Sequence, residues 1–447
     1  MAATENANPR SNAALQLEPY PNPPAETRLR AIIMADDIGE VQVILPERAM
    51  LDVNAIRAAT GRQLRARAYE PDAPTSAVPG TYGIPVILEE NLTRRGKLAL
   101  ATEEASKYLC ASGGTLLSGY YETRTATISH PVSAEPTPGD RSGDMAQIGE
   151  TLSRFTAQRM QERLDQTLHI PPLPEAARRI VALQADPNYD LADLVQIIET
   201  DPSIASRIMG WANSAFYNPD PKAKSLEDAV MRVLGFDTVM SMALGMALGQ
   251  TLRMPAEEVR GLPSFWLDAI FTAATMEALA RRMPQEGRPE AGLCYLAGLL
   301  SNFGTLVVGH VFPHQHAQLC LLQEANRHLP HSHVDQHVLQ LPREVIASAL
   351  LEAWSLPEPV TDAVRFQNLA DYQGGNRTYV LLLRLSRQLL GNQGITDVPV
   401  RATDELDLAT LGFDHDAVHE VMQLVNASKD ELDGFANMLG RDGRATA

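Results

Sequence analysis

Residues 199–217 read ETDPSIASRIMGWANSAFY, and this stretch decides the fold of the larger, C-terminal part of the chain. Asp201 is a typical helix N-cap residue, and Pro202 follows it at the first helical position, where the missing N–H of proline has no helical partner to lose. Apolar residues then recur every four positions, on one face of a helix. The polar pair Asn213 and Ser214 ends the pattern. The stretch therefore predicts a capped helix with one buried face.

Helical signals continue on both sides of this stretch. Asp190 precedes an apolar stripe of helical spacing, and Ser225 begins a second one that Gly235 closes. The strongly apolar residues Thr238–Gly249 are too few to span a bilayer, so we interpret them as a buried helix. Nothing in this region alternates like a strand. We predict an all-α domain over residues 155–372.

Length and charge narrow the class of protein. The chain has 447 residues, which is too long for one ordinary core, and its formal net charge of −17 repels phosphate backbones. We therefore expect several domains and no nucleic-acid partner. The three cysteines are far apart, and the N-terminus has no apolar segment behind a basic start, so we expect a cytoplasmic protein without a membrane partner.

The rest of the chain divides by composition. Residues 1–27 are rich in Asn, Pro and Ala and predict a disordered leader, whereas residues 28–130 contain short apolar strands and a helix capped by Asp52. Residues 131–154 include a Pro- and Gly-rich stretch and predict a linker. Residues 373–447 predict a helical extension. The fold class is thus a multidomain one, with a small α/β domain followed by an all-helical bundle.

The order of elements in the helical domain resembles the HDOD family, the bacterial, non-catalytic relatives of HD-type phosphohydrolases. The matching segments are IPPLPEAARRI at 170–180, the opening stretch at 199–217, SLEDAVMRVLGFDTV at 225–239, Phe265-Trp266, AGLLSNFG at 297–304 and LEAWSLPEPV at 351–360. The resemblance implies a signal-transduction protein in which this domain is a binding or output module.

The same resemblance locates the positions at which HD hydrolases bind divalent cations through His and Asp side chains. The His-Asp dyad is replaced by Ser301-Asn302, the position two residues past Trp266 carries Asp268, and the later paired histidines correspond to Phe366-Gln367. We therefore predict no catalytic residue, no metal and no cofactor at this site.

Four further residues of the matching segments could contact a ligand or serve the fold, namely Asp201, Asn213, Ser214 and Trp266. Such polar residues prefer helix ends. For Asn213 and Ser214 we favour capping over ligand contact.

Histidines gather in one region. Seven of the 11 lie between His310 and His337, and the pairs His310/His314 and His333/His337 have the spacing that places two imidazoles on one helix face. One hypothesis is that these histidines bind a metal at a new position and that the protein is a phosphohydrolase. The other, which we favour, is a polar, solvated insert without carboxylate partners.

Residues 28–130 resemble the YbaK-type, prolyl-tRNA-editing superfamily, whose members hydrolyse misacylated tRNA with a lysine on an early strand and a glycine-rich loop. No lysine precedes Lys97 here, so the early strand offers only Arg28 or Arg30, whose planar guanidinium is no substitute for an ammonium group. Gly80, Gly83 and Pro85 resemble the loop but also suit a turn into a strand. We predict a degenerate domain, and an aminoacyl-tRNA deacylase is the alternative.

Together these features favour a regulatory protein. We expect its partner to be a signalling protein or a small regulatory ligand, and the sequence leaves its oligomeric state open.

Overall fold

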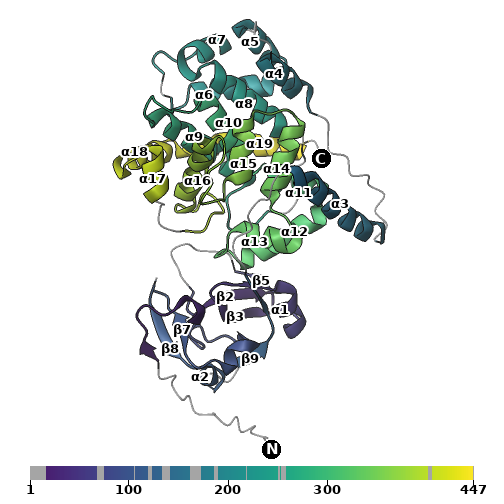
Figure 1. The fold of residues 1–447 in the computed structure, drawn as a ribbon, viewed down its shortest axis with the longest axis vertical. Helices are drawn as coiled ribbons and strands as arrows, with labels where there is room; N and C mark the ends of the chain where they lie inside the picture. The colour runs from purple at the N-terminus through teal and green to yellow at the C-terminus, as the bar shows by residue number, and fades with distance from the viewer. Residues whose placement is uncertain are drawn as a thin grey trace, which may run out of the picture. The chain divides into compact units, whose positions relative to one another are not determined.

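The structure is a computed structural model that describes residues 17–67, 75–104, 106–118, 123–132, 141–161, 173–185, 190–217, 219–249, 252, 258–400 and 405–445. The chain forms two compact units (Figure 1). Unit 1 contains residues 1–134 with the short segments Val259–Gly261 and Leu319–Leu329, and unit 2 contains the remainder.

Unit 1 is built on a mixed sheet with the strand order β1-β8-β7-β2-β3-β6-β9 and with β5 paired to β2. Strands β4 and β10 form a separate pair. The strands are β1 (Glu18–Pro19), β2 (Arg28–Asp36), β3 (Gly39–Pro46), β4 (Ala49–Leu51), β5 (Arg65–Ala66), β6 (Val86–Glu89), β7 (Leu98–Ala101), β8 (Tyr108–Ala111), β9 (Thr123–Ala126) and β10 (Ser129–Pro131). The helices are η1 (Ala25–Thr27), α1 (Val53–Thr60), η2 (Glu90–Arg94) and α2 (Gly113–Ser118).

Strands β2 and β3, two of the predicted apolar strands, pair as an antiparallel hairpin. At its turn, Asp36 Oδ1 accepts hydrogen bonds from the backbone N–H groups of Ile38 (2.9 Å) and Gly39 (3.2 Å), and Gly39 adopts a φ of 150°. Helix α1 has the predicted Asp52 cap, which accepts hydrogen bonds from two backbone N–H groups. Ala59, one residue before the end of this helix, is exposed.

Two predicted irregular segments contain regular structure. Part of the predicted leader, Glu18–Pro19, joins the sheet as an edge strand paired with β8, because an unpaired sheet edge accepts any extended segment beside it. Part of the predicted linker forms helix α3 (Asp144–Gln161). Ion pairs hold its start in unit 2: Arg141 pairs with Asp362, and Asp144 Oδ1 accepts from Arg365 Nη2 at 2.7 Å.

Unit 2 is helical throughout the residues described. Its first helices are η3 (Arg141–Gly143), α3, α4 (Glu175–Ala185), α5 (Leu191–Glu199), α6 (Pro202–Ala212), α7 (Leu226–Asp228), the π-helical turn η4 (Ala229–Leu234) and α8 (Phe236–Gly249). Next come α9 (Phe265–Arg282), α10 (Ala291–Leu299), α11 (Phe303–Val311), α12 (Pro313–Ala325), whose last residues group with unit 1, and α13 (His331–Val338). The last are α14 (Arg343–Ala353), α15 (Glu358–Phe366), α16 (Arg377–Gly391), α17 (Glu405–Leu411), α18 (His415–Ala427) and α19 (Lys429–Ala445).

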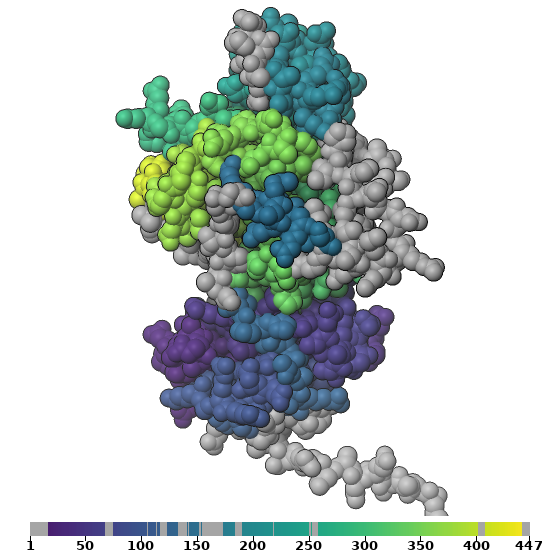
Figure 2. Space-filling view, turned by 45° about the vertical axis from the view of Figure 1, so that its right-hand side comes forward, coloured from purple at the N-terminus to yellow at the C-terminus, as the bar shows by residue number. Residues whose placement is uncertain are grey.

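Helices α8, α9 and α10 form the centre of unit 2, and α16 and α19 also pack on α9. All residues of α8 from Thr238 to Gly249 are buried, as the sequence predicts. Helices α9 and α10 approach closely at Gly298, where a Cβ atom would lie 2.6 Å from the Ala273 Cα atom. In the space-filling view, the green and yellow C-terminal segments cover much of the visible face of unit 2 (Figure 2).

The helical stretch Ala291–Val311 is long and apolar enough to cross a membrane. In this structure 78% of its most apolar window is buried inside the protein. Burial of this extent is typical of a core helix in a globular domain.

A buried ion network at the HD-motif positions

Four of the five positions expected to replace HD metal ligands lie together in unit 2. Asp268 is in the first turn of α9, and Ser301 and Asn302 form the break between α10 and α11. Asn302 Nδ2 donates to Asp268 Oδ2 at 3.3 Å, and Gln367 Nε2 donates to the Ser301 carbonyl oxygen at 2.9 Å. Phe366 is the exception, because its ring stacks on Tyr372 with centroids 4.6 Å apart.

A guanidinium group lies among these positions. Arg387, on α16, donates from Nη1 to Asp268 Oδ1 and to Ser301 Oγ, both at 3.2 Å. Its Nη2 donates to Asp397 Oδ1 at 2.5 Å. The Arg387 side chain is only 3% exposed, so these bonds are shielded from water. The protein therefore places a cation of its own among these positions.

Asp397 extends the network to a buried histidine. Its Oδ2 atom lies 2.9 Å from His331 Nδ1, at the start of α13, while His331 Nε2 makes a short contact with Glu344 Oε1 in the first turn of α14. Asn368 Nδ2 also donates to Glu344 Oε1, at 3.1 Å. The histidine thus lies between two buried carboxylates, contrary to the expectation of a solvated insert without carboxylate partners.

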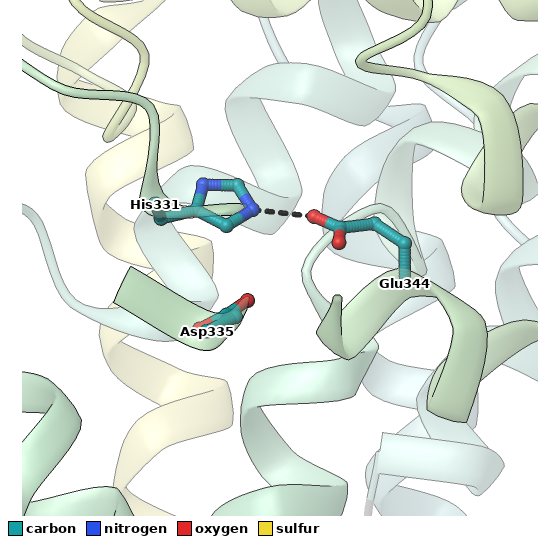
Figure 3. A group of neighbouring side chains, drawn as sticks. All are labelled: His331, Asp335 and Glu344. Carbon is teal, nitrogen blue, oxygen red and sulfur yellow. Dashed lines mark hydrogen bonds and ion pairs between the residues drawn. The ribbon is translucent and has the colours of Figure 1, made fainter. Parts of the chain in front are cut away.

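A further ion pair borders this histidine. Arg343 donates from Nε and Nη2 to the two carboxylate oxygens of Asp335, both at 2.7 Å. The side chains of His331, Asp335 and Glu344 lie around the same space (Figure 3). Their candidate ligand atoms are all within 4.8 Å of one another.

The network shifts the pKa values of its members. Burial raises the pKa of the Asp268 carboxyl to about 6, and the nearby Asp397 adds to this, although Arg387 opposes it. For His331, burial disfavours the charged imidazolium, but the carboxylates of Asp397 and Glu344 outweigh burial and raise its pKa to about 10. The pKa of Asp397 lies well below its ordinary value, because His331 and Arg387 together overcome the effect of burial.

The residues at the HD positions do not fit a divalent ion. Ser301, Asn302 and Gln367 offer neutral oxygens and amides, and the one carboxylate, Asp268, already accepts bonds from Arg387, Thr272 and Asn302. Arg387 neutralises this one carboxylate, so the side chains at these positions offer no further negative charge to hold a divalent ion. We therefore derive no hydrolytic step from a metal at these positions.

The other residues singled out in the sequence have structural contacts. Asp201 caps α6, with Oδ1 accepting from the backbone N–H groups of Ser203 (2.9 Å) and Ile204 (3.2 Å). Asn213 is the C-cap residue of α6, and its side chain also pairs with both the N–H and the carbonyl of Ala223 (2.8 and 3.0 Å), which closes a loop.

Ser214 and Trp266 are buried. The Ser214 Oγ and Trp266 Nε1 atoms have no hydrogen-bond partner among the residues described. The Trp266 ring contacts α8 at Gly249, where a Cβ atom would lie 2.0 Å from it.

The editing-like loop of unit 1 is a turn that leads into β6. Gly80 and Gly83 adopt φ values of 83° and 65°, and the Pro85 carbonyl oxygen accepts from the Gln42 N–H at 2.9 Å. Beside this turn lies a pocket of about 790 Å³, with Thr81, Lys107 and Tyr108 among the residues that line it. Arg28, on the early strand, is engaged by Glu47, at 3.8 Å, and by the Tyr108 ring.

The histidine pairs differ from their predicted arrangement. His310 lies in the last turn of α11 and His314 in the first turn of α12, so the two histidines share no helix face. His333 and His337 do share α13, but the histidine that enters the network is His331.

Sequence reasoning missed the charged partners in this network, namely Asp335, Arg343, Glu344, Arg387 and Asp397. A signal was present in TYVLLLRLSRQLLG at 378–391, where two arginines interrupt a strongly apolar helix. An arginine in a buried helix needs an acidic partner. The sequence predicts residues 373–447 only as a helical extension outside the domain.

Comparisons with known proteins agree with this architecture. The model of the HDOD domain matches residues 170–370. A crystal structure of a protein from Marinobacter aquaeolei VT8, provisionally described as a signal transduction protein, is 33% identical over 93% of this chain and 94% of that one, with a TM-score of 0.82.

Two further matches are weaker. An uncharacterized protein of Treponema pallidum (strain Nichols) is 26% identical over 219 residues, and the chain spans only 41% of that relative's length. A protein provisionally described as a trans-editing enzyme for prolyl tRNA synthetase is 16% identical over 24% of this chain and 73% of that one, with a TM-score of 0.22. The domain match and the full-length relative together show that the chain belongs to the HDOD family.

Proposed function

We propose that the chain is a cytoplasmic regulatory protein of signal transduction in which a non-catalytic HDOD domain is a binding or output module, coupled to a degenerate YbaK-like domain. The coarse assignment to the HDOD family supports this proposal. We further propose that unit 2 does not catalyse hydrolysis and that unit 1 is a sensor.

One observation carries the proposal: the Arg387 guanidinium lies among the HD-motif positions, bonded to Asp268 and Ser301. Metal-dependent hydrolysis needs a cation with an open coordination position, so that bound water can lose a proton near neutral pH. A guanidinium has no such position and does not lose its own proton in a protein. The arrangement supports binding rather than turnover.

The test is an assay of the purified full chain against p-nitrophenyl phosphate, bis-p-nitrophenyl phosphate and cyclic dinucleotides. Each substrate is supplied with Mn²⁺, Mg²⁺, Ni²⁺ or Zn²⁺. We expect product formation at the rate of the protein-free blank. Turnover that scales with protein concentration and disappears with a chelator would contradict the proposal.

The pocket of unit 1 supports a sensor role for that unit. Its volume of about 790 Å³ lies in the range of small-molecule sites. Ser76, Thr81 and Thr102 offer hydroxyl groups, Glu103 and Lys107 offer charges of both signs, and Tyr108 offers a ring. We propose that a small polar ligand binds here and regulates the protein. A thermal-shift screen with free amino acids and nucleotides tests this, with T81W as the variant that obstructs the pocket.

The alternative for this unit is an aminoacyl-tRNA deacylase that uses the same pocket. Lys107 is a cation on its lining, which favours this alternative, but it forms an ion pair with Glu104 and both side chains are largely exposed. A deacylation assay with mischarged tRNAs separates the two functions. We expect no release of amino acid above the spontaneous rate, and protein-dependent release would establish the alternative.

A further inference from the structure

Three potential metal ligands converge beside, but not at, the HD-motif positions. His331 and Asp335 lie one turn apart on α13, and Glu344 lies in the first turn of α14. Their side chains are 5%, 0% and 4% exposed, and each offers one ligand atom within 4.8 Å of the others. One imidazole and two carboxylates form a donor set suited to a divalent transition ion.

Each of the three side chains is held by a second group, as metal ligands usually are. Asp397 Oδ2 lies 2.9 Å from His331 Nδ1, which leaves Nε2 to face Glu344. Arg343 fixes the Asp335 carboxylate with two bonds of 2.7 Å. Asp335 Oδ2 also accepts from the Arg343 backbone N–H at 3.2 Å, whereas Oδ1 accepts one bond from Arg343 and keeps its second lone pair for an ion.

An independent observation comes from the hydrogen-bond inventory. Glu344 Oε2 is buried and has no hydrogen-bond partner among the residues described. Ser332 Oγ, on the residue after His331, is also buried without such a partner. An unpaired carboxylate oxygen in the interior costs free energy unless an ion, a water molecule or a donor satisfies it. This oxygen belongs to one of the three converging side chains.

The charges of the network favour a cation over an anion. Four buried carboxylates, those of Asp268, Asp335, Glu344 and Asp397, face the two guanidinium groups of Arg343 and Arg387, which leaves two negative charges. A proton on His331 balances one of them, whereas a divalent cation bound to neutral His331 balances both. A phosphate would add negative charge and is therefore disfavoured.

We propose that His331, Asp335 and Glu344 form a binding site for one divalent transition ion, Zn²⁺ or Mn²⁺, that links α13 to α14. The site differs from the HD-motif positions in every ligand. Its function is to tie the two helices together, and it is compatible with the absence of hydrolysis proposed above.

The first experiment uses the full-length wild-type chain. Its metal content is measured by inductively coupled plasma mass spectrometry after purification without chelator or affinity metal, and again after chelation and equilibrium dialysis against Zn²⁺ or Mn²⁺. We expect one equivalent of one of these ions per chain and a rise in melting temperature when it binds. A wild-type chain that holds neither ion after dialysis would overturn the proposal.

Variants locate the ion. Glu344→Gln and His331→Gln keep the size of each side chain and should reduce affinity at least about tenfold, and Asp397→Asn should reduce it about 10- to 100-fold by removing the bond that orients His331. His337→Ala is the matched control, because His337 lies exposed on the same helix. Each variant is compared only if its far-ultraviolet circular dichroism matches that of wild type.

Ion binding that survives both Glu344→Gln and His331→Gln would place the ion elsewhere and overturn the assignment. Failure here is distinguishable from failure of the proposed function. Bound ion without phosphoester turnover supports both proposals. Turnover that disappears in Ser301→Ala but persists in Glu344→Gln would contradict the proposed function alone, and an ion-free, inactive protein would contradict only this inference.

Discussion

At the scale of single residues, Arg387 is the central side chain of the buried ion network. Its guanidinium neutralises two buried carboxylates, Asp268 and Asp397, that come from different parts of unit 2. Removing one partner of a buried ion pair is costly because the remaining charge stays without compensation in a medium of low polarity. The same physics explains why such a residue can replace a metal ion as the local positive charge.

We therefore expect Arg387→Met to lower the free energy of unfolding by about 3–5 kcal/mol. The matched control is Arg282→Met, because Arg282 pairs with Glu420 where the two side chains are 45% and 59% exposed. Exposed ion pairs contribute only about 0–1 kcal/mol to the free energy of unfolding. Urea denaturation of both variants measures the difference, and equal effects would show that Arg387 is not a central partner.

Asp268 gives a prediction about pH. Its pKa is raised from 3.8 to about 6 in the folded chain, chiefly by burial, so the folded state binds the proton more tightly than the unfolded state does. The resulting stabilisation is complete below pH 3.8 and is lost as the pH rises through 6. Relative to Asp268→Asn, wild type should lose up to about 1.4 kcal/mol per pH unit between pH 4 and 6.

The measurement is a series of urea denaturations of both proteins at pH values from 4 to 8. The difference between the two proteins should level off above pH 6. A difference that does not change with pH would mean that Asp268 keeps an ordinary carboxyl pKa in the folded chain.

At the scale of elements, close helix packing brings the network together. Gly298 allows α10 to lie against α9, because a Cβ atom there would meet Ala273 Cα at 2.6 Å. Helix α9 carries Asp268, and the residues after α10 carry Ser301 and Asn302. The position of these three side chains thus depends on a contact that only glycine permits.

Gly298→Ala should lower the free energy of unfolding by about 1–3 kcal/mol, because the backbones must separate to admit the methyl group. The control is Gly149→Ala in α3, where a Cβ atom has no neighbour within 4 Å. In that open helical position alanine should stabilise the chain by about 0.5–1 kcal/mol. Thermal denaturation of the two variants should therefore give shifts of opposite sign, and shifts of the same sign would contradict the packing argument.

Several elements were predictable because local signals and burial agree. The Asp201 cap and the Pro202 start define α6 in the sequence as in the structure, and α8 is buried from Thr238 to Gly249 as its composition predicts. Where only composition was available, the prediction failed. Helix α3 begins at Asp144 inside the predicted linker, because ion pairs made by Arg141 and Asp144 with distant residues hold it, and no local pattern encodes such partners.

The candidate site was predictable only in part, for the same reason. The family resemblance placed Asp268, Ser301, Asn302 and Gln367 at one site, and the structure brings these four side chains together. The family resemblance does not include Arg387 or Asp397. Both lie in residues 373–447, which the sequence predicts to be an extension outside the domain. Side-chain contacts between segments so far apart depend on tertiary packing that one sequence does not reveal.

At the scale of the whole molecule, the chain combines a mixed-sheet unit that contains a pocket with a helical unit whose HD-motif positions are joined by ion pairs. Both features favour binding over catalysis. A pocket of about 790 Å³ offers a place for a small ligand, and the ion network gives unit 2 a charge arrangement that no longer resembles a hydrolytic centre.

The most direct test of the central claim is a turnover measurement on one sample of full-length chain whose bound metal has first been quantified. The sample is saturated with Mn²⁺ and given bis-p-nitrophenyl phosphate. We predict that product forms no faster than in the protein-free blank, whatever the metal content. Turnover proportional to the metal-loaded protein, and lost in Ser301→Ala or Asp268→Asn, would contradict it.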